Sequence, residues 1–259
     1  MGYNVPNEIL VRTRKTAANP SGKVGYELDD VAKMPMGVFQ RIQDNIIGAR
    51  TQVYWDGAVL ISGTALTVGQ KVTLFREGQD EDGKIWNTGV VFNKTYSHTN
   101  MVEGGQFEYG VSVIVFAMEV FWIVPPAKAN AYGGDGLITD SSDAAAQPAL
   151  YNAPQFAKAI EEQCKFTFRR GSDINEENGL LVDLPSNSGI AASLGAQTNT
   201  QMVQNSLGPN SARRLDFPKV LHSKENFQVD LEQIAPTLPI PVTTILRFRL
   251  IGKRLRSAA

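Results

Sequence analysis

Val111-Ser-Val-Ile-Val-Phe-Ala-Met-Glu-Val-Phe-Trp-Ile-Val124 is the longest apolar run in the chain, and only Ser112 and Glu119 interrupt it. The run is rich in Val, Ile and Phe, which favour strands, and Pro125-Pro126 ends it. A helix needs about 20 apolar residues to cross a bilayer, so this run is too short for a membrane span. It predicts one or two strands that are buried on both faces.

Other segments alternate apolar and polar residues, as half-buried strands do. These segments are residues 51–57, 66–75, 85–92, 164–170, 180–184 and 242–250. Asp80-Glu-Asp-Gly83 and Asn178-Gly179 predict hairpin turns before two of them. Together with 23 Gly and 13 Pro in 259 residues, these regular short strands predict an all-β sandwich or barrel.

Residues 125–154 are mostly small and turn-forming, which predicts a linker between two halves of similar size. Each half has the same order of features: a short amphipathic helix near a proline, a strand that ends in a charged residue and glycine, and a strongly apolar last strand. Corresponding points lie 117, 114 and 120 residues apart, namely Phe39 and Phe156, Gly57 and Gly171, and Phe107 and Phe227. These near-constant offsets predict a structural duplication, although residues 125–154 also fit a lid loop or insertion.

We therefore expect two tandem β-sandwiches, each with a short helix before its first strand. The predicted boundaries are an N-terminal arm at 1–34, a first sandwich at 35–126, a linker at 127–153 and a second sandwich at 154–259 with a basic last strand. Residues 186–211 are rich in Asn, Ser, Gln and Gly and predict a long surface loop. The alternative for the whole chain is therefore a single sandwich plus an irregular domain.

Charge is distributed unevenly, although the formal net charge is only −1. The first 25 residues carry +3 and the last 13 carry +5, so the body between them carries −9. Basic ends of this kind are typical of contacts with the phosphates of nucleic acids or lipid headgroups, and solvated ends are the simpler interpretation. The basic residues assigned to such contacts are Arg12, Arg14, Lys15, Arg247, Arg249, Lys253, Arg254 and Arg256.

The sequence contains no catalytic motif that we recognise. Its single cysteine, Cys164, lies in a predicted strand, and its two histidines, His98 and His222, form no metal-binding pattern. We expect no catalytic, cofactor-binding or metal-binding residues, no cofactor and no enzymatic activity. The N-terminus also lacks the basic and apolar regions of a signal peptide.

Acidic residues and tryptophans keep a glycosidase site open as an alternative, since such enzymes use two carboxyl groups in an aromatic cleft. Glu119 is the one acid expected to be buried, and the simpler interpretation is a structural carboxylate that is paired within the chain or lies between subunits. The residues concerned are Glu103, Glu108, Glu119, Trp55, Trp86 and Trp122.

With two β halves, a helix before each first strand, a small-residue linker and basic ends, residues 35–254 resemble the double jelly-roll major capsid proteins of tailless icosahedral bacteriophages, particularly those that enclose a membrane. The resemblance implies two jelly rolls per chain, trimers of pseudo-hexagonal outline, and an icosahedral shell built from them. This chain is short for that family, and its second half contains the long predicted loop.

The resemblance also implies partners and a location. The partners are two further copies in a homotrimer, neighbouring capsomers, other minor virion proteins, and an internal lipid membrane or the genome in contact with the basic termini. The location is the virion shell, after synthesis in the host cytoplasm. The alternative function is a carbohydrate-binding or adhesive β-sandwich module of a phage spike or tail, for which Trp55, Trp86 and Trp122 would supply an aromatic platform.

Overall fold

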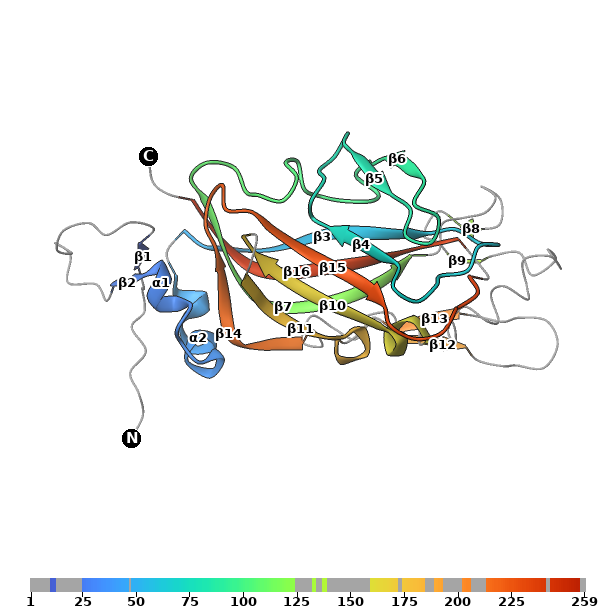
Figure 1. Cartoon of the computed structure of the whole chain (residues 1–259). Helices are drawn as coiled ribbons and strands as arrows, with labels where there is room; N and C mark the ends of the chain where they lie inside the picture. Colours follow the sequence, from blue (N-terminus) through green and yellow to red (C-terminus); the bar gives the residue numbers. More distant parts are fainter. Residues whose placement is uncertain are drawn as a thin grey trace.

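A computed structural model of the chain describes residues 10–12, 25–46, 48–123, 132–133, 137–138, 159–171, 174–184, 189–192, 202–205, 213–240 and 243–256. The fold within these residues is almost entirely antiparallel β-structure, with a few short helices (Figure 1). The sequence prediction of an all-β sandwich is therefore confirmed.

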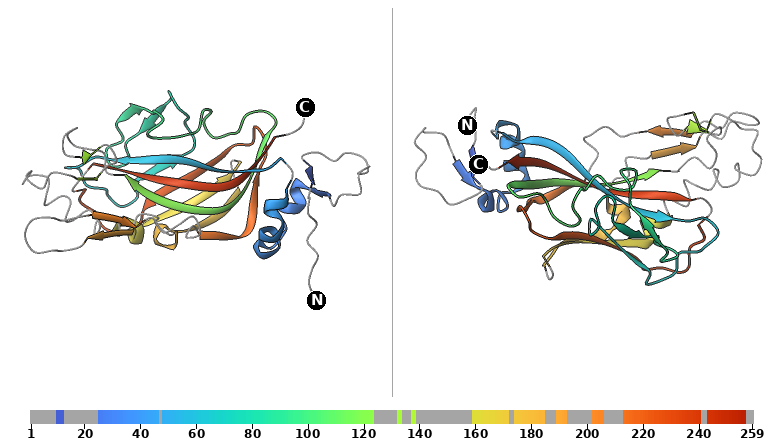
Figure 2. Two further views of the ribbon diagram at one scale, coloured as in Figure 1. Left: turned by 180° about the vertical axis from the view of Figure 1, so that it is seen from behind. Right: turned by 90° about the horizontal axis from the view of Figure 1, so that it is seen from above.

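Eight strands form two four-stranded antiparallel sheets. Sheet 1 has the order β14-β7-β16-β3, and its strands are β14 (Arg213–Leu221), β7 (Val111–Ile123), β16 (Thr244–Arg256) and β3 (Arg50–Leu60). Sheet 2 has the order β11-β10-β15-β4, and its strands are β11 (Ile174–Leu180), β10 (Cys164–Arg170), β15 (Phe227–Gln233) and β4 (Lys71–Leu74). Figure 2 shows the two sheets from behind and from above.

These eight strands pair in a nested order: the first pairs with the last, the second with the last but one, and so on inward. The pairs are β3 with β16, β4 with β15, β7 with β14, and β10 with β11. Such nesting is what results when one long antiparallel hairpin rolls up into two packed sheets, which is the arrangement of an eight-stranded jelly roll.

The expected division into two tandem jelly rolls, at 35–126 and 154–259, is wrong for the described strands. Each sheet contains strands from both sides of the proposed linker: β3 and β7 share sheet 1 with β14 and β16, and β4 shares sheet 2 with the other three strands. The two halves cannot separate, because each supplies pairing partners to the other. Most of residues 127–153 lies outside the described residues.

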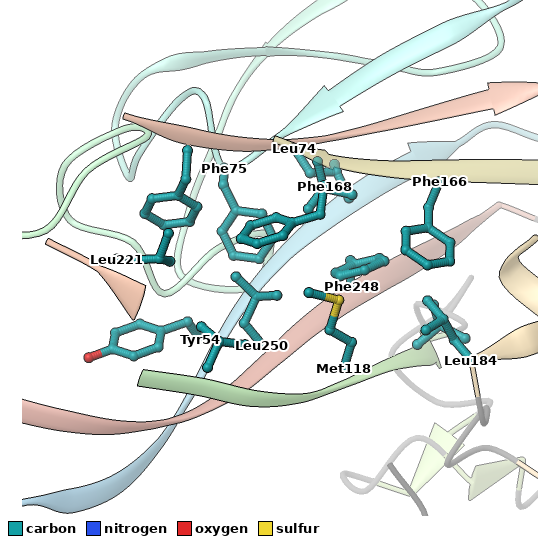
Figure 3. Close-up of a cluster of buried hydrophobic side chains, with 14 of the residues drawn as sticks. Tyr54, Leu74, Phe75, Met118, Phe166, Phe168, Leu184, Leu221, Phe248 and Leu250 are labelled. Carbon is teal, nitrogen blue, oxygen red and sulfur yellow. The ribbon is translucent and has the colours of Figure 1, made fainter. Parts of the chain in front are cut away.

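Apolar side chains from the two sheets meet in one core (Figure 3). Phe248 of β16 and Phe166 of β10 contact across it, with ring centroids 5.7 Å apart. On β15 buried and half-buried residues alternate along the strand, as expected for a sheet with one face inward. The core side chains labelled in Figure 3 are Tyr54, Leu74, Phe75, Met118, Phe166, Phe168, Leu184, Leu221, Phe248 and Leu250.

Residues 75–110 connect β4 to β7, and we call them the excursion. It contains the hairpin β5 (Asp82–Lys84) and β6 (Val91–Asn93), which lies above β3 and β4 in Figure 1. The excursion bonds to the free edge of β3: the amide of Asn100 accepts from Trp55 N at 2.7 Å and donates to Val53 O at 2.8 Å. This covers an edge that would otherwise be open to pairing with another chain.

The N-terminal residues pack beside β14. They form β1 (Leu10–Arg12), β2 (Gly25–Glu27), α1 (Leu28–Val31), α2 (Met36–Ile42) and the 3-10 turn η1 (Gln43–Asn45). Phe39 of α2 is buried and lies 6.0 Å from the ring of Phe116 in β7. The predicted helix before β3 is thus present, and helical residues 159–163 likewise precede β10.

The remaining elements lie in two long connections. Between β7 and β10 are β8 (Tyr132–Gly133) and β9 (Leu137–Ile138), and between β11 and β14 are the 3-10 turn η2 (Leu181–Asp183), β12 (Gly189–Ala192) and β13 (Met202–Asn205). β12 pairs with β13 inside the stretch that was predicted to be a loop, 186–211.

Two predicted strands differ from the structure. Residues 85–92 hold the turn between β5 and β6, because Ile85 N–H donates to Val90 O and not to a neighbouring strand. Asn178-Gly179 is not a turn: both residues pair with β10 inside β11, and η2 occupies most of the segment that follows. Tertiary pairing has overridden the local turn preference in the second case.

Candidate functional site

The outer face of sheet 1 carries a cluster of arginines and aromatic rings, which we call the arginine–aromatic surface. It consists of Trp55 on β3, Arg247 and Arg249 on β16, Phe121 on β7 and Tyr96 from the excursion. Strand register brings the first four together, because Arg249 is paired with Trp55, and Arg247 is paired with Phe121. Alternation along β16 keeps both arginines on the face opposite to Phe248.

Each arginine of this surface lies over an aromatic ring. The Arg247 guanidinium is 5.3 Å from the centre of the Trp55 ring, and that of Arg249 is 5.7 Å from the centre of the Phe121 ring. Such contacts favour a cation over the ring face. Partial burial, and then the charge of Arg249, lower the pKa of Arg247. Arg247 nevertheless stays charged at neutral pH, since its starting value is so high.

Tyr96 is the most exposed member of the arginine–aromatic surface. Its ring meets Trp55 edge-on at 5.4 Å, and its side chain is 64% exposed. Trp55 Nε1 and Arg247 Nε are both buried without a hydrogen-bond partner. The surface therefore presents the exposed ring of Tyr96 beside half-buried arginines and aromatic rings.

The outer face of sheet 2 has a different character. Glu232 lies between Lys165 at 2.9 Å and Lys71 at 3.3 Å, and Asp230 pairs with Arg169 at 3.2 Å. These acids and bases alternate across strands β4, β15 and β10 and neutralise one another. Such a face is typical of a surface in contact with solvent.

A buried charge cluster lies where the excursion meets β3. Lys94 Nζ is 2.7 Å from Asp56 Oδ2, and the two side chains are 3% and 0% exposed. Glu77 Oε2 is 3.7 Å from the same nitrogen. Sequence analysis did not predict this cluster. One signal was present, because Asp56 alternates with Tyr54 and Ala58 and therefore lies at an inward-facing position of the strand.

Sequence reasoning assigned eight basic residues to phosphate contacts, and the structure distributes the described ones among different environments. Lys253 is almost fully buried and pairs with Asp44 after α2 at 2.9 Å, so it holds the N-terminal region against β16. Arg249 pairs with Glu119 at 2.6 Å, and Arg254 lies 3.8 Å from Glu108. Arg256 is exposed. Arg14 and Lys15 lie outside the described residues, as does the side chain of Arg12.

The proposed carboxylate and tryptophan set does not come together as one cleft. Glu119 is buried, as predicted, and it forms an ion pair with Arg249 of the same chain. Glu103 pairs with Lys224, and Glu108 with Arg254. Trp86 and Trp122 are 3% and 5% exposed, so neither can offer a binding platform.

The two histidines lie in separate loops. His98 Nδ1 is within 3.1 Å of Thr95 N, and burial, then Lys94 and Arg247, lower the pKa of His98. His222 Nε2 is 3.1 Å from Asp29 Oδ1 of α1. Within the described ranges, no three His, Cys, Asp or Glu side chains gather as a metal site would require. No helix among those residues is long and apolar enough to cross a bilayer.

We expect Cys164 to be unreactive in the folded protein. It is fully buried, its thiol donates to Gln233 Oε1 at 2.8 Å, and burial raises the pKa of Cys164 to about 12. A thiol reagent at neutral pH should therefore modify it only after denaturation, as colorimetric thiol titration would show. Rapid modification of the native protein would contradict this assignment.

The same burial makes the fold sensitive to alkali. Burial also raises the pKa of Tyr54 to about 12. Between pH 9 and 12 the unfolded chain loses thiol and phenol protons that the folded chain keeps, so the free energy of unfolding falls as pH rises.

Comparisons with protein-family models, with curated proteins and with solved structures found no significant match to this chain.

Proposed function

We propose that this protein is a structural subunit of a virion shell and that its jelly roll assembles with further copies of itself. The nested strand pairing carries this proposal, since the jelly roll is a recurrent fold of viral capsid subunits. The same fold also serves lectins and cupins, so the fold alone does not decide the function. The surfaces of the molecule must therefore distinguish a capsid subunit from a lectin or a cupin.

The arginine–aromatic surface supports assembly. Interfaces between proteins are enriched in Arg, Trp, Tyr and Phe at their centres, and these residues carry most of the binding energy. Sheet 1 presents such residues, whereas the outer face of sheet 2 presents paired charges. We assign the contact between neighbouring copies to sheet 1. Minor virion proteins, lipid and genome are further partners under this proposal, with the basic termini as their contact.

The described strands form one sandwich per chain, which changes the expected capsomer. Three chains with one jelly roll each supply three sandwiches, so a pseudo-hexagonal outline would require six chains and not the expected three. Light scattering after size-exclusion chromatography would give the copy number, and electron microscopy of negatively stained samples would show rings or closed particles. A monomer at high concentration would overturn the proposal.

Replacing Tyr96 by Asp should weaken assembly without unfolding the chain. Tyr96 is exposed, so the change costs little folding stability, but it places a negative charge in the proposed contact. Loss of an aromatic anchor of this kind costs about 2 kcal/mol or more, so the dissociation constant should rise by about 30-fold or more. Analytical ultracentrifugation would measure it.

Val68→Asp is the matched control for this change. Val68 is 64% exposed, as is Tyr96, but it lies in the β3–β4 loop and not on the arginine–aromatic surface. The control should assemble as the wild type does. If both variants weakened assembly equally, or if neither weakened it, the arginine–aromatic surface would not be part of the contact.

The alternative of a glycan-binding module has less support. Two of its three tryptophans are buried, and Trp55 is packed between Arg247 and Tyr96. Only Tyr96 of this group presents an exposed ring.

A further inference from the structure

The buried cluster of Asp56, Lys94 and Glu77 has the composition of a reaction site. An amine and a carboxyl group are in contact, with Lys94 Nζ 2.7 Å from Asp56 Oδ2 and therefore close to the carboxyl carbon one bond further away. Reacting groups held at about 3–3.5 Å approach the geometry of attack. A buried ion pair is the ordinary interpretation, but the groups around the pair also favour a reaction between the amine and the carboxyl group.

Backbone amides hold the Asp56 carboxyl group in place. Gly57 N–H donates to Oδ1 at 2.9 Å, and Phe75 N–H donates to Oδ2 at 2.5 Å. Gly57 N–H is placed to stabilise the negative charge that develops on Oδ1 during attack at the carboxyl carbon, and Phe75 N–H fixes the position of Oδ2. They also keep the carbon in one position relative to Lys94.

The surroundings favour the neutral form of the acid, and a proton acceptor is near. Burial raises the pKa of Asp56, against the opposing effects of Lys94 and of the two amides. Glu77 supplies a second carboxylate near the amine, with its Oε2 3.7 Å from Lys94 Nζ. The Glu77 carbonyl oxygen also accepts from Lys94 Nζ at 3.4 Å, which helps to orient the amine.

We propose that Lys94 and Asp56 condense to form an intramolecular isopeptide bond. A proton passes from Nζ to Oδ2, which converts the ion pair into an amine and a carboxylic acid. The Nζ lone pair then attacks Cγ, and the charge that develops on Oδ1 is held by Gly57 N–H. Glu77 accepts the second Nζ proton and returns it to the departing hydroxyl group. One C–N bond forms, one C–O bond breaks, and one water leaves, with no change of net charge and no co-reactant.

Exclusion of bulk water favours this product, because amide formation releases a water that the buried site does not retain. The bond would join β3 to the excursion and make permanent the cover over the edge of sheet 1. It would form within a single chain, so it does not depend on whether the protein assembles into a shell.

The chain contains a matched comparison for this chemistry. Lys165 and Glu232 approach to 2.9 Å, almost the same separation, but the lysine is 44% exposed and the glutamate 20%. Water there stabilises both charges, and within the described part of the chain Glu232 is the one carboxylate that forms an ion pair with the Lys165 amine. We expect a bond at the buried pair and none at the exposed pair.

Intact-mass spectrometry of the denatured, purified full-length protein is the decisive experiment. The wild type should be lighter than its sequence by one water. Trypsin should fail to cleave after acylated Lys94, so peptide 85–128 should appear linked to peptide 51–71, which contains Asp56. An intact mass equal to that calculated from the sequence, together with tryptic cleavage after Lys94, would overturn the proposal regardless of the results with variants.

Four variants sharpen the result. Lys94→Arg keeps the positive charge but should abolish the mass deficit. Asp56→Asn should lose ammonia in place of water. Glu77→Gln should form the bond about 100-fold more slowly or less completely, because the proton acceptor is gone. Lys165→Arg, the control at the exposed pair, should keep the wild-type deficit. A deficit that persists in Lys94→Arg would place the lost water elsewhere and refute the assignment.

Discussion

Replacing Phe248 by Ala should lower the free energy of unfolding by about 3–5 kcal/mol. Phe248 lies on β16, which is hydrogen-bonded on both sides, to β3 and to β7. Its side chain is fully buried and contacts Phe166 of sheet 2. Its loss would leave a cavity between the two sheets that neighbouring rings cannot fill without moving. Guanidinium unfolding followed by tryptophan fluorescence would measure the change.

Phe217→Ala provides the comparison for this prediction. Phe217 lies on the edge strand β14 and is 46% exposed, so its truncation removes little buried area. Its effect should stay within about 0.5 kcal/mol. Similar losses for both variants would mean that the core is not centred between the two sheets.

Individual strands were predictable where one feature dominated the sequence. The apolar run 111–124 forms β7, the alternating segment 164–170 forms β10, and 242–250 lies largely within β16. β14 was not predicted, because Pro218 interrupts it. Register with β7 is lost between Arg214 and Lys219, and an edge strand can tolerate a proline at such a bulge.

The pairing of strands could not be predicted from the same features. Alternation of apolar residues indicates which face of a strand is buried, but not which strand lies beside it. The two segments with matching sequence order, 51–57 and 164–170, fall in different sheets, as β3 and β10. Two supposed repeat positions, Phe107 and Phe227, stack on each other at 5.0 Å. The similarity of the halves is therefore not evidence for two separate sandwiches.

Prediction of the candidate site was limited by distance along the chain. Glu119 was expected to be a buried structural carboxylate, paired or between subunits, and its partner is Arg249. The residues of the arginine–aromatic surface come from β3, β7, β16 and the excursion. They are far apart in the sequence, so no local motif predicts the surface. Lys94 stands in a polar segment that gives no sign of burial. Only the topology brings it to Asp56.

Replacing Gly104 by Ala should be among the most damaging small changes in the chain. A methyl group at this position would lie 2.2 Å from Arg76 O and 2.8 Å from Glu81 Oε2. The Arg76 backbone would have to move, and it follows Phe75, whose N–H holds Asp56. Overpacking of this kind costs about 3 kcal/mol, which should lower the melting temperature by about 6–12 °C in a chain of this size. Differential scanning calorimetry would measure it.

Gly37→Ala separates this steric effect from the general effect of replacing a glycine. Gly37 lies on the exposed side of α2, and a methyl group there would meet nothing within 4 Å. Alanine restricts the unfolded chain and favours helix, so the substitution should raise stability by up to about 1 kcal/mol. The two substitutions should therefore have opposite signs. If Gly104→Ala were also neutral or stabilising, the close approach of residues 76 and 104 would be wrong, and with it the position of the excursion that places Lys94 beside Asp56.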